Sequence, residues 1–228
     1  MPEKYCVISC HVLWREISYF ASLSKNTIHP IFLEQGLHNI PSKLQETLQN
    51  AIDEVDEDNY DAVLLGYGLC SNGLAGIHAN NIPLVAVRAH DCITLLLGSK
   101  EKYRQFFDEN PGTYWYSPGW IETGWQPGEA RYKHQLAEYA VKYGEDNAKY
   151  LMEMESGWFT KYSNAAYVDL GFGDNREFKE FTRECARYLE WDYKELRGDP
   201  SLLIDWLEGN WDQERYLVVN PKEIIKPS

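Results

Sequence analysis

The sequence predicts an α/β fold, in which a Rossmann-like parallel sheet carries helices on both faces and a smaller helical and βα C-terminal lobe covers it. Short apolar runs in the first half each end in a Gly, Cys or His cluster and precede a helix-like segment. After about residue 120 the chain becomes polar and rich in tyrosine, and a second βα pattern follows. We therefore expect one lobe over residues 1–125 and another over residues 126–228, or one continuous domain.

Five apolar runs are the predicted strands of the first half: residues 5–9, 29–33, 62–65, 84–87 and 114–116. The helix after the second strand is predicted from apolar positions three and four apart at Leu44, Leu48 and Ile52. Ser42 is its expected N-cap, because Gln45 follows three residues later as in a capping box.

Further helices are expected over residues 12–23 and from residue 93 onward. In the second half, residues 131–154 predict a long polar and aromatic helix. A strand over residues 165–170, a helix over 178–189, a short helix over 201–207 and a last strand over 216–219 complete the chain.

Composition restricts the kind of partner. The formal charge is −13, with 35 acidic against 22 basic residues, so the field of the protein repels phosphate backbones and anionic lipid. No apolar run reaches the roughly 18 residues that a membrane span needs. The five cysteines follow no small secreted pattern, and reduced thiols are expected. We expect a cytoplasmic protein that acts on a small molecule, with neither nucleic acid nor membrane as partner.

Soft and hard ligand residues follow four consecutive predicted strands. They are Cys10, His38, Cys70, His90 and Cys92. Ligands of open parallel sheets bind at the carboxyl ends of the strands, so these side chains are expected to converge on one site. Thiolate and imidazole favour zinc, iron or an iron–sulfur cluster over magnesium or calcium.

The pair His90 and Cys92, with Cys70 as a more distant third ligand, would leave one zinc position open, as catalytic zinc requires. Asp91 lies between the pair, where it either points away or accepts a hydrogen bond from a ligand imidazole. If Cys92 opens the helix expected from residue 93, the helix dipole favours its thiolate.

A glycine-rich segment follows the third strand. Gly66 and Gly68 allow positive φ and a close approach of backbone N–H groups to an anion, with Ser71 or Asn72 as a cap. Its spacing matches neither a dinucleotide fingerprint nor a P-loop. Arg88 can grip a carboxylate in bidentate fashion, and Tyr67 can form a pocket wall. The expected catalytic residues are Arg88, Asp91 and Tyr67.

Two Cys-bearing motifs, at residues 66–74 and 88–99, together with residues 37–39 and 111–114, resemble the family called domain of unknown function 1638 over roughly residues 5–220. The resemblance implies an origin in anaerobic bacteria or archaea and an association with corrinoid-dependent methyltransferase systems. It also implies a corrinoid protein or a methyltransferase as partner. His11 stands where a small residue is expected in relatives, and it is a further local ligand or a pocket wall.

Three functions remain open from the sequence. The first is a zinc-dependent transferase or lyase. The second is an iron–sulfur enzyme whose cluster is held by Cys10, Cys70 and Cys92. The third is a non-catalytic metal-binding accessory of a methyltransferase system. No Asp-x-His-x-x-Gly segment is present to supply a lower ligand to a corrinoid.

Overall fold

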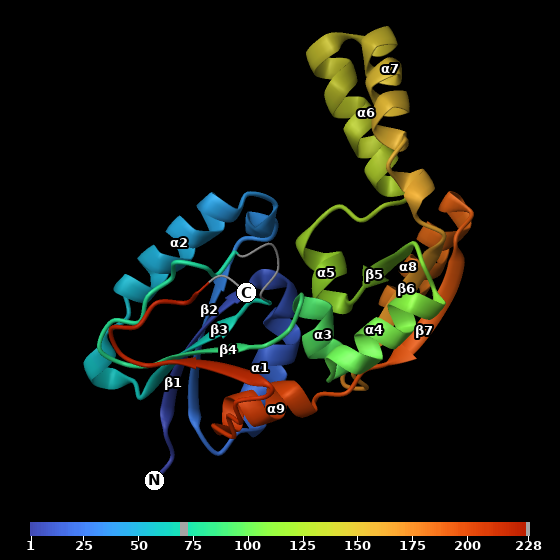
Figure 1. The fold of residues 1–228 in the computed structure, drawn as a ribbon. Coiled ribbons are helices and arrows are strands. Elements are labelled where there is room, and N and C mark those ends of the chain that lie inside the picture. Colours follow the sequence, from blue (N-terminus) through green and yellow to red (C-terminus); the bar gives the residue numbers. More distant parts are fainter. Residues whose placement is uncertain (69–72, 227–228) are drawn as a thin grey trace. The chain divides into compact units, whose positions relative to one another are not determined.

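The structure is a computed structural model that describes residues 1–68 and 73–226 of the 228-residue chain (Figure 1). By their contacts the residues form two units. Unit 1 comprises residues 1–103 and 199–228, and unit 2 comprises residues 104–198. None of the helices in the described ranges combines the length and the apolar composition that a bilayer crossing requires.

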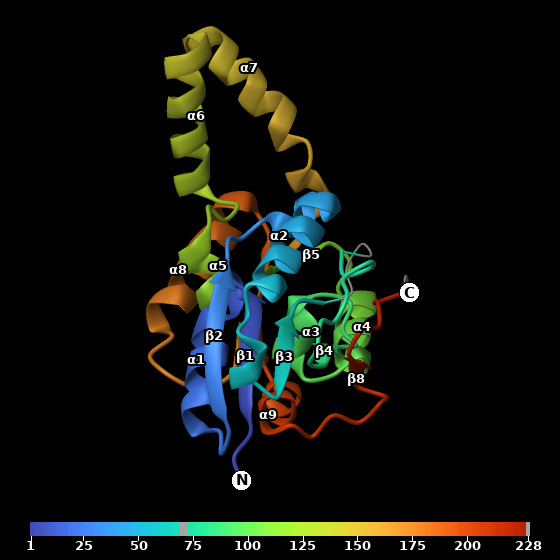
Figure 2. The ribbon, with the colours of Figure 1, turned by 90° about the vertical axis from the view of Figure 1, so that its left-hand side faces the viewer.

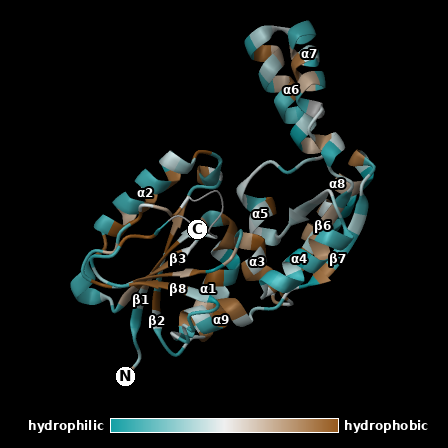
Figure 3. Cartoon of the chain, in the orientation of Figure 1, coloured by the Kyte–Doolittle hydropathy of each residue, from teal (hydrophilic) through white to brown (hydrophobic). Residues whose placement is uncertain are grey.

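Unit 1 is built on a five-stranded sheet of order β2-β1-β3-β4-β8. The strands are β1 (Lys4–Cys10), β2 (Thr27–Leu33), β3 (Ala62–Gly66), β4 (Leu84–Val87) and β8 (Tyr216–Val219). The first four are parallel, and β8 adds to β4 in antiparallel direction. Val7, Leu64 and Val85 are fully buried, which agrees with strands that are covered on both faces. Figure 3 shows apolar colour along this sheet.

Helices cover both faces of the unit 1 sheet, which confirms the predicted fold class. These α-helices are α1 (Trp14–Leu23), α2 (Pro41–Asp53), α3 (Cys92–Leu97) and α9 (Ser201–Glu208). Helix α4 (Lys100–Glu109) begins in unit 1 and continues into unit 2. Short 3-10 helices are η1 (His11–Leu13), η2 (Leu37–Asn39) and η3 (Glu57–Asn59). Figures 1 and 2 show α2 on one face and α1, α3 and α9 on the other.

Unit 2 contains a parallel three-stranded sheet of order β5-β6-β7. Its strands are β5 (Thr113–Tyr116), β6 (Asn164–Asp169) and β7 (Asp192–Arg197). Its further helices are α5 (Pro118–Thr123), α6 (Glu129–Tyr143), α7 (Glu145–Ser156), η5 (Phe159–Lys161) and α8 (Arg176–Leu189). The core joins Tyr116 and Tyr167 of the sheet to Cys185 and Ala186 of α8.

The structure changes four details of the sequence prediction. The run at residues 113–116 pairs with β6 and therefore belongs to the second sheet. The expected helix over residues 131–154 is two helices, separated at Gly144, whose φ is +83°. Strand β7 was missed. Helix α2 begins at Pro41, after Ile40 as N-cap, and no side chain caps it, so the predicted cap at Ser42 is wrong.

The last two predicted elements join unit 1 rather than the C-terminal lobe. Strand β8 pairs with β4, and Trp206 of α9 is fully buried with its indole N–H donating to the carbonyl of Val85 at 3.1 Å. The chain therefore leaves unit 1 after Tyr103, forms unit 2, and returns at Asp199 to complete the first sheet.

Candidate functional site

The carboxyl ends of β1, β3 and β4 lie at one edge of the unit 1 sheet, because the three strands are parallel and adjacent. Ser9 of β1 pairs with Gly66 at the end of β3. Cys10 is the last residue of β1, and the segment that leads from β4 to α3 contains Arg88, His90 and Asp91. This carboxyl edge is the part of the fold where the sequence predicted a site.

Two glycines allow close backbone contacts at this edge. A Cβ on Gly66 would lie 2.2 Å from Oγ of Ser9, whose hydroxyl donates to the Gly66 carbonyl at 3.1 Å. A Cβ on Gly68 would lie 2.6 Å from Cα of Asp91. Neither glycine adopts the positive φ that the sequence suggested. Gly66 lets β3 pair closely with β1 at Ser9, and Gly68 lets the backbone just after β3 pass against the segment that follows β4.

Cys10 places a buried thiol at this edge, with 6% of the residue exposed. Burial raises the pKa of the thiol, while backbone N–H groups of His11 and Val12 donate to the sulfur and act in the opposite direction. The sulfur therefore lies in an environment that disfavours a bare thiolate but already offers it two donors.

Tyr67 brings a buried phenol close to this thiol. The residue is 6% exposed, and its hydroxyl has no hydrogen-bond partner among the described residues. Burial raises the pKa of Tyr67, and the charge that Cys10 would carry raises it further. A buried hydroxyl without a partner costs free energy.

His38 and Asp91 come from loops that follow different strands, yet they interact electrostatically. Burial lowers the pKa of His38, and the negative charge of Asp91 opposes that effect. The Asp91 carboxylate caps α3, since its Oδ1 accepts from the backbone N–H groups of Ile93 and Thr94 at 3.1 and 3.2 Å. His38 is thus held toward the neutral form, which is the form that ligates metals.

The expected ligands on the β4 side differ in exposure. The side chain of His90 is 76% exposed, lies 3.5 Å from Oδ2 of Asp91 through its Nδ1, and stacks on Tyr103 with ring centroids 6.1 Å apart. Cys92 is partly buried and is the first residue of α3, one residue before the expected start of that helix.

Arg88 has a structural role that the sequence did not predict. Its Nε donates to the carbonyls of Gln213 and Tyr216, at 3.1 Å each, and its backbone N–H donates to Arg215 at 2.8 Å. These bonds hold the segment that enters β8. Its predicted part in catalysis stays a prediction.

Three of the predicted site residues, Cys70, Ser71 and Asn72, lie outside the described residues. Within residues 1–68 and 73–226, no three or more His, Cys, Asp or Glu side chains form a group that could hold a metal ion. The metal prediction therefore stays a prediction.

Glu16 is a residue that sequence reasoning missed. It lies in the first turn of α1, directly after the carboxyl edge at Cys10 and η1, and it is only 2% exposed. The signal was present in the sequence, because Glu16 occupies the same helical face as the buried Ile17 and Phe20. His11 is exposed and stacks on Phe32 of β2 with ring centroids 5.8 Å apart, and its expected part as a ligand or pocket wall stays a prediction.

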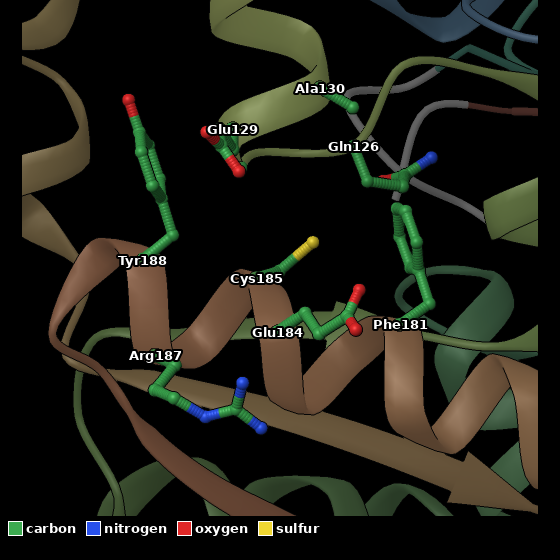
Figure 4. Close-up of a pocket in the computed structure, with 9 residues that line it drawn as sticks. Gln126, Glu129, Ala130, Phe181, Glu184, Cys185, Arg187 and Tyr188 are labelled. Carbon is green, nitrogen blue, oxygen red and sulfur yellow. The ribbon is translucent and has the colours of Figure 1, made fainter.

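Unit 2 holds a cavity of about 530 Å³ between the start of α6 and α8. Figure 4 shows the thiol of Cys185 pointing into it, with the rings of Phe181 and Tyr188 to either side and the carboxylates of Glu129 and Glu184 nearby. Burial raises the pKa of Cys185 to about 11, so this thiol is protonated at neutral pH. The cavity is a polar and aromatic pocket rather than a site for a reactive thiolate.

The chain matches one family model. The family described as protein of unknown function (DUF1638) matches residues 32–207, which is more than half of the chain, and the chain belongs to this family. The resemblance drawn from the two Cys-bearing motifs is thereby confirmed. No curated protein and no solved structure matches the chain.

Proposed function

We propose that this protein is an enzyme that acts on a small molecule through a transition metal, most simply zinc, held at the carboxyl edge of the unit 1 sheet. Cys10, His38, Cys70, His90 and Cys92 are the ligand candidates, and not all of them need to bind at once. The metal would act as a Lewis acid toward a thiol or an oxygen of the substrate. By its family resemblance the substrate belongs to corrinoid-linked one-carbon or methyl metabolism in an anaerobe.

The observation that carries this proposal is the contact between the loops. Gly66, the last residue of β3, lies against Ser9 of β1, and Gly68, just after β3, lies against Asp91 in the segment that follows β4. Cys70 follows Gly68 by two residues, Cys10 follows Ser9, and Cys92 follows Asp91. In this proposal the three cysteines are near neighbours because the residues next to them are in contact.

The chemistry of the described donors fits a soft metal. The sulfur of Cys10 already accepts two backbone N–H groups, and burial keeps His38 toward its neutral form. Metals bind neutral imidazole and thiolate, and a bound metal would offset the burial that raises the pKa of the Cys10 thiol. The described residues alone offer no group of three such ligands, so the proposal gives Cys70 a decisive part.

In this proposal Tyr67 donates a hydrogen bond to the substrate. Its hydroxyl is buried and has no partner in the described structure, and it lies near Cys10. A substrate oxygen or a metal-bound group would satisfy it.

An iron–sulfur cluster held by Cys10, Cys70 and Cys92 is the second candidate. The donation of the His11 and Val12 N–H groups to the Cys10 sulfur favours it, because such bonds tune cluster thiolates. A corrinoid protein or a methyltransferase would be the partner in a purely accessory role.

Metal analysis of protein purified without oxygen and without added metal tests the proposal. We expect about one zinc per chain, and at least about a tenfold weaker retention in Cys70→Ser and in Cys92→Ser. Cys185→Ala is the matched control, because it removes a buried thiol from unit 2, and it should keep the metal.

Two results would separate the alternatives. A brown protein that contains iron and sulfide, lost in the same variants, would replace zinc by the cluster. Wild-type protein that carries neither zinc nor iron under these conditions would refute the metal enzyme.

A further inference from the structure

Helices α6 and α7 form an antiparallel hairpin joined at Gly144 (Figures 1 and 2). No residue of the fifteen in α6 is buried, and in α7 only Ala148 and Met152 are buried among the side chains described. Most helices in proteins are stabilised by packing of an apolar face. This hairpin therefore has more apolar surface than its own two helices cover.

The uncovered surface follows a regular spacing. On α6 the residues recur at intervals of four, three and four. On α7 the pairs 147/150 and 151/154 are three residues apart, and the pairs 147/151 and 150/154 are four residues apart. The two stripes are Tyr132, Leu136, Tyr139 and Tyr143 on α6, and Asn147, Tyr150, Leu151 and Met154 on α7. Tyr143, Tyr150 and Met154 are 44%, 61% and 67% exposed. Spacings of three and four are those of seams between packed helices.

A depression of about 420 Å³ lies where the two stripes meet. It is lined by Tyr139 and Tyr143 of α6 and by Asn147, Tyr150 and Leu151 of α7. Aromatic side chains of this kind are enriched at protein interfaces, and the depression can receive a side chain of a partner helix.

The two helices carry opposite charge. Helix α6 has three basic residues, Arg131, Lys133 and Lys142, against two acidic ones, which gives +1. Helix α7 has four acidic residues, Glu145, Asp146, Glu153 and Glu155, against Lys149, which gives −3. In a two-fold pair of hairpins α6 of one copy can lie beside α7 of the other, so that unlike charges meet at both contacts.

We propose that the α6–α7 hairpin is a self-association surface, through which two copies of this chain form a four-helix bundle. The stripes form its centre, and the flanks of α6 and α7 pair by charge. The proposal does not depend on the metal site, because every residue it uses lies in unit 2.

The test is the mass of the full-length protein in solution, measured by light scattering over a concentration series. We expect a dimer of the wild type, and at least about a tenfold weaker association of Tyr150→Glu and of Leu151→Glu. Val141→Glu is the matched control. Val141 is 91% exposed and lies nine residues from Tyr132, which places it on the opposite side of α6 from the stripe.

Circular dichroism shows whether each variant keeps its helices, so that loss of the dimer is not confused with unfolding. High salt should weaken the wild-type dimer, because the flanks pair by charge. A wild type that stays monomeric at every concentration would overturn the proposal. So would a dimer that tolerates both stripe substitutions as well as it tolerates Val141→Glu.

Discussion

At the scale of single residues, the stability of a Tyr67→Phe variant shows whether the buried hydroxyl of Tyr67 serves ligand binding or the stability of the fold. Replacing Tyr67 by Phe removes a hydroxyl that has no partner in the described structure. We expect the free energy of unfolding to stay the same or to rise by up to about 1 kcal/mol, because an unsatisfied polar group is removed. Metal content should not change, since Tyr67 is not a proposed ligand. Urea unfolding measures the first quantity.

Tyr216→Phe is the control for this prediction. Tyr216 is also buried in unit 1, but its hydroxyl donates to the carbonyl of Leu202 at 2.9 Å. Its loss removes a buried hydrogen bond, and we expect a cost of about 0.5–1.5 kcal/mol. If Tyr67→Phe were the more destabilising of the two, the hydroxyl of Tyr67 would have a structural partner.

The lowered pKa of His38 predicts how the stability of the folded protein depends on pH. Burial lowers the pKa of His38 below 6.5, so between its folded pKa and 6.5 the unfolded chain binds more protons than the folded one. Stability should therefore fall as pH falls below 6.5, and His38→Gln, which cannot be protonated, should flatten that part of the curve. Thermal unfolding of metal-free protein between about pH 7 and about pH 5 measures the difference.

The Asp91→Asn variant tests whether the charge of Asp91 acts on His38. The charge of Asp91 opposes the effect of burial on His38, and an Asn can still cap α3 through its oxygen. NMR titration of His38 should show a pKa that is lower in Asp91→Asn than in the wild type. An unchanged pKa would mean that the two side chains do not interact.

The residues of the candidate site were predictable to different degrees. Cys10 and Cys92 could be placed at the ends of elements, because an apolar run shows where a strand stops. The bonds of Arg88 to carbonyls at Gln213 and Tyr216 join parts of the chain more than 120 residues apart, and no local pattern encodes them. Glu16 was missed because the sequence pattern does not tell whether an acidic residue beside apolar positions of a helix is buried or exposed.

At the scale of elements, the contact between the loops depends on Gly68. Gly68→Ala would place a Cβ 2.6 Å from Cα of Asp91, and backbone cannot move aside cheaply. We expect a loss of about 1–3 kcal/mol in the stability of unit 1, together with weaker metal retention. Chemical denaturation and metal analysis measure the two effects.

Gly157→Ala is the control at the end of α7. Its φ is −57°, and an added Cβ would meet only the carbonyl oxygen of Met154 at 3.6 Å, an ordinary contact. We expect it to be neutral. If Gly68→Ala were equally harmless, the loops after β3 and β4 would not be in contact as described.

Element boundaries show where pattern reading succeeds and fails. The spacing of Leu44, Leu48 and Ile52 predicted the buried face of α2 correctly. The predicted N-cap, Ser42, lies two residues after the observed one, Ile40, because Pro41 fits the first position of the helix, where a missing N–H costs nothing. Gly144 interrupts a continuous helical pattern by adopting positive φ, which Gly permits but does not require.

At the scale of the whole molecule, unit 1 depends on residues that come last in the chain. Trp206 is fully buried, and its indole donates to Val85 of β4. We expect Trp206→Ala to cost about 3–5 kcal/mol in unfolding free energy. Trp125→Ala, which truncates a tryptophan that is 55% exposed, should cost less than about 1 kcal/mol. Equal effects would contradict the packing of α9 against the sheet.

The fold class followed from the sequence because parallel strands buried on both faces leave continuous apolar runs. The assignment of strands to sheets did not follow. The runs at β5 and β8 look like the others, but β5 pairs with β6 and β8 returns to β4. Pairing between distant strands depends on the course of the whole chain, which no local pattern records.

The central claim is that sulfur and imidazole ligands gather at the carboxyl edge of unit 1. X-ray absorption at the zinc edge, on protein purified without oxygen, tests it most directly. The account predicts a mixed shell, with sulfur at about 2.3 Å and nitrogen at about 2.0–2.1 Å, and fewer sulfur neighbours in Cys92→Ser. A shell of oxygen alone, or one that Cys10→Ser, Cys70→Ser and Cys92→Ser all leave unchanged, would contradict it.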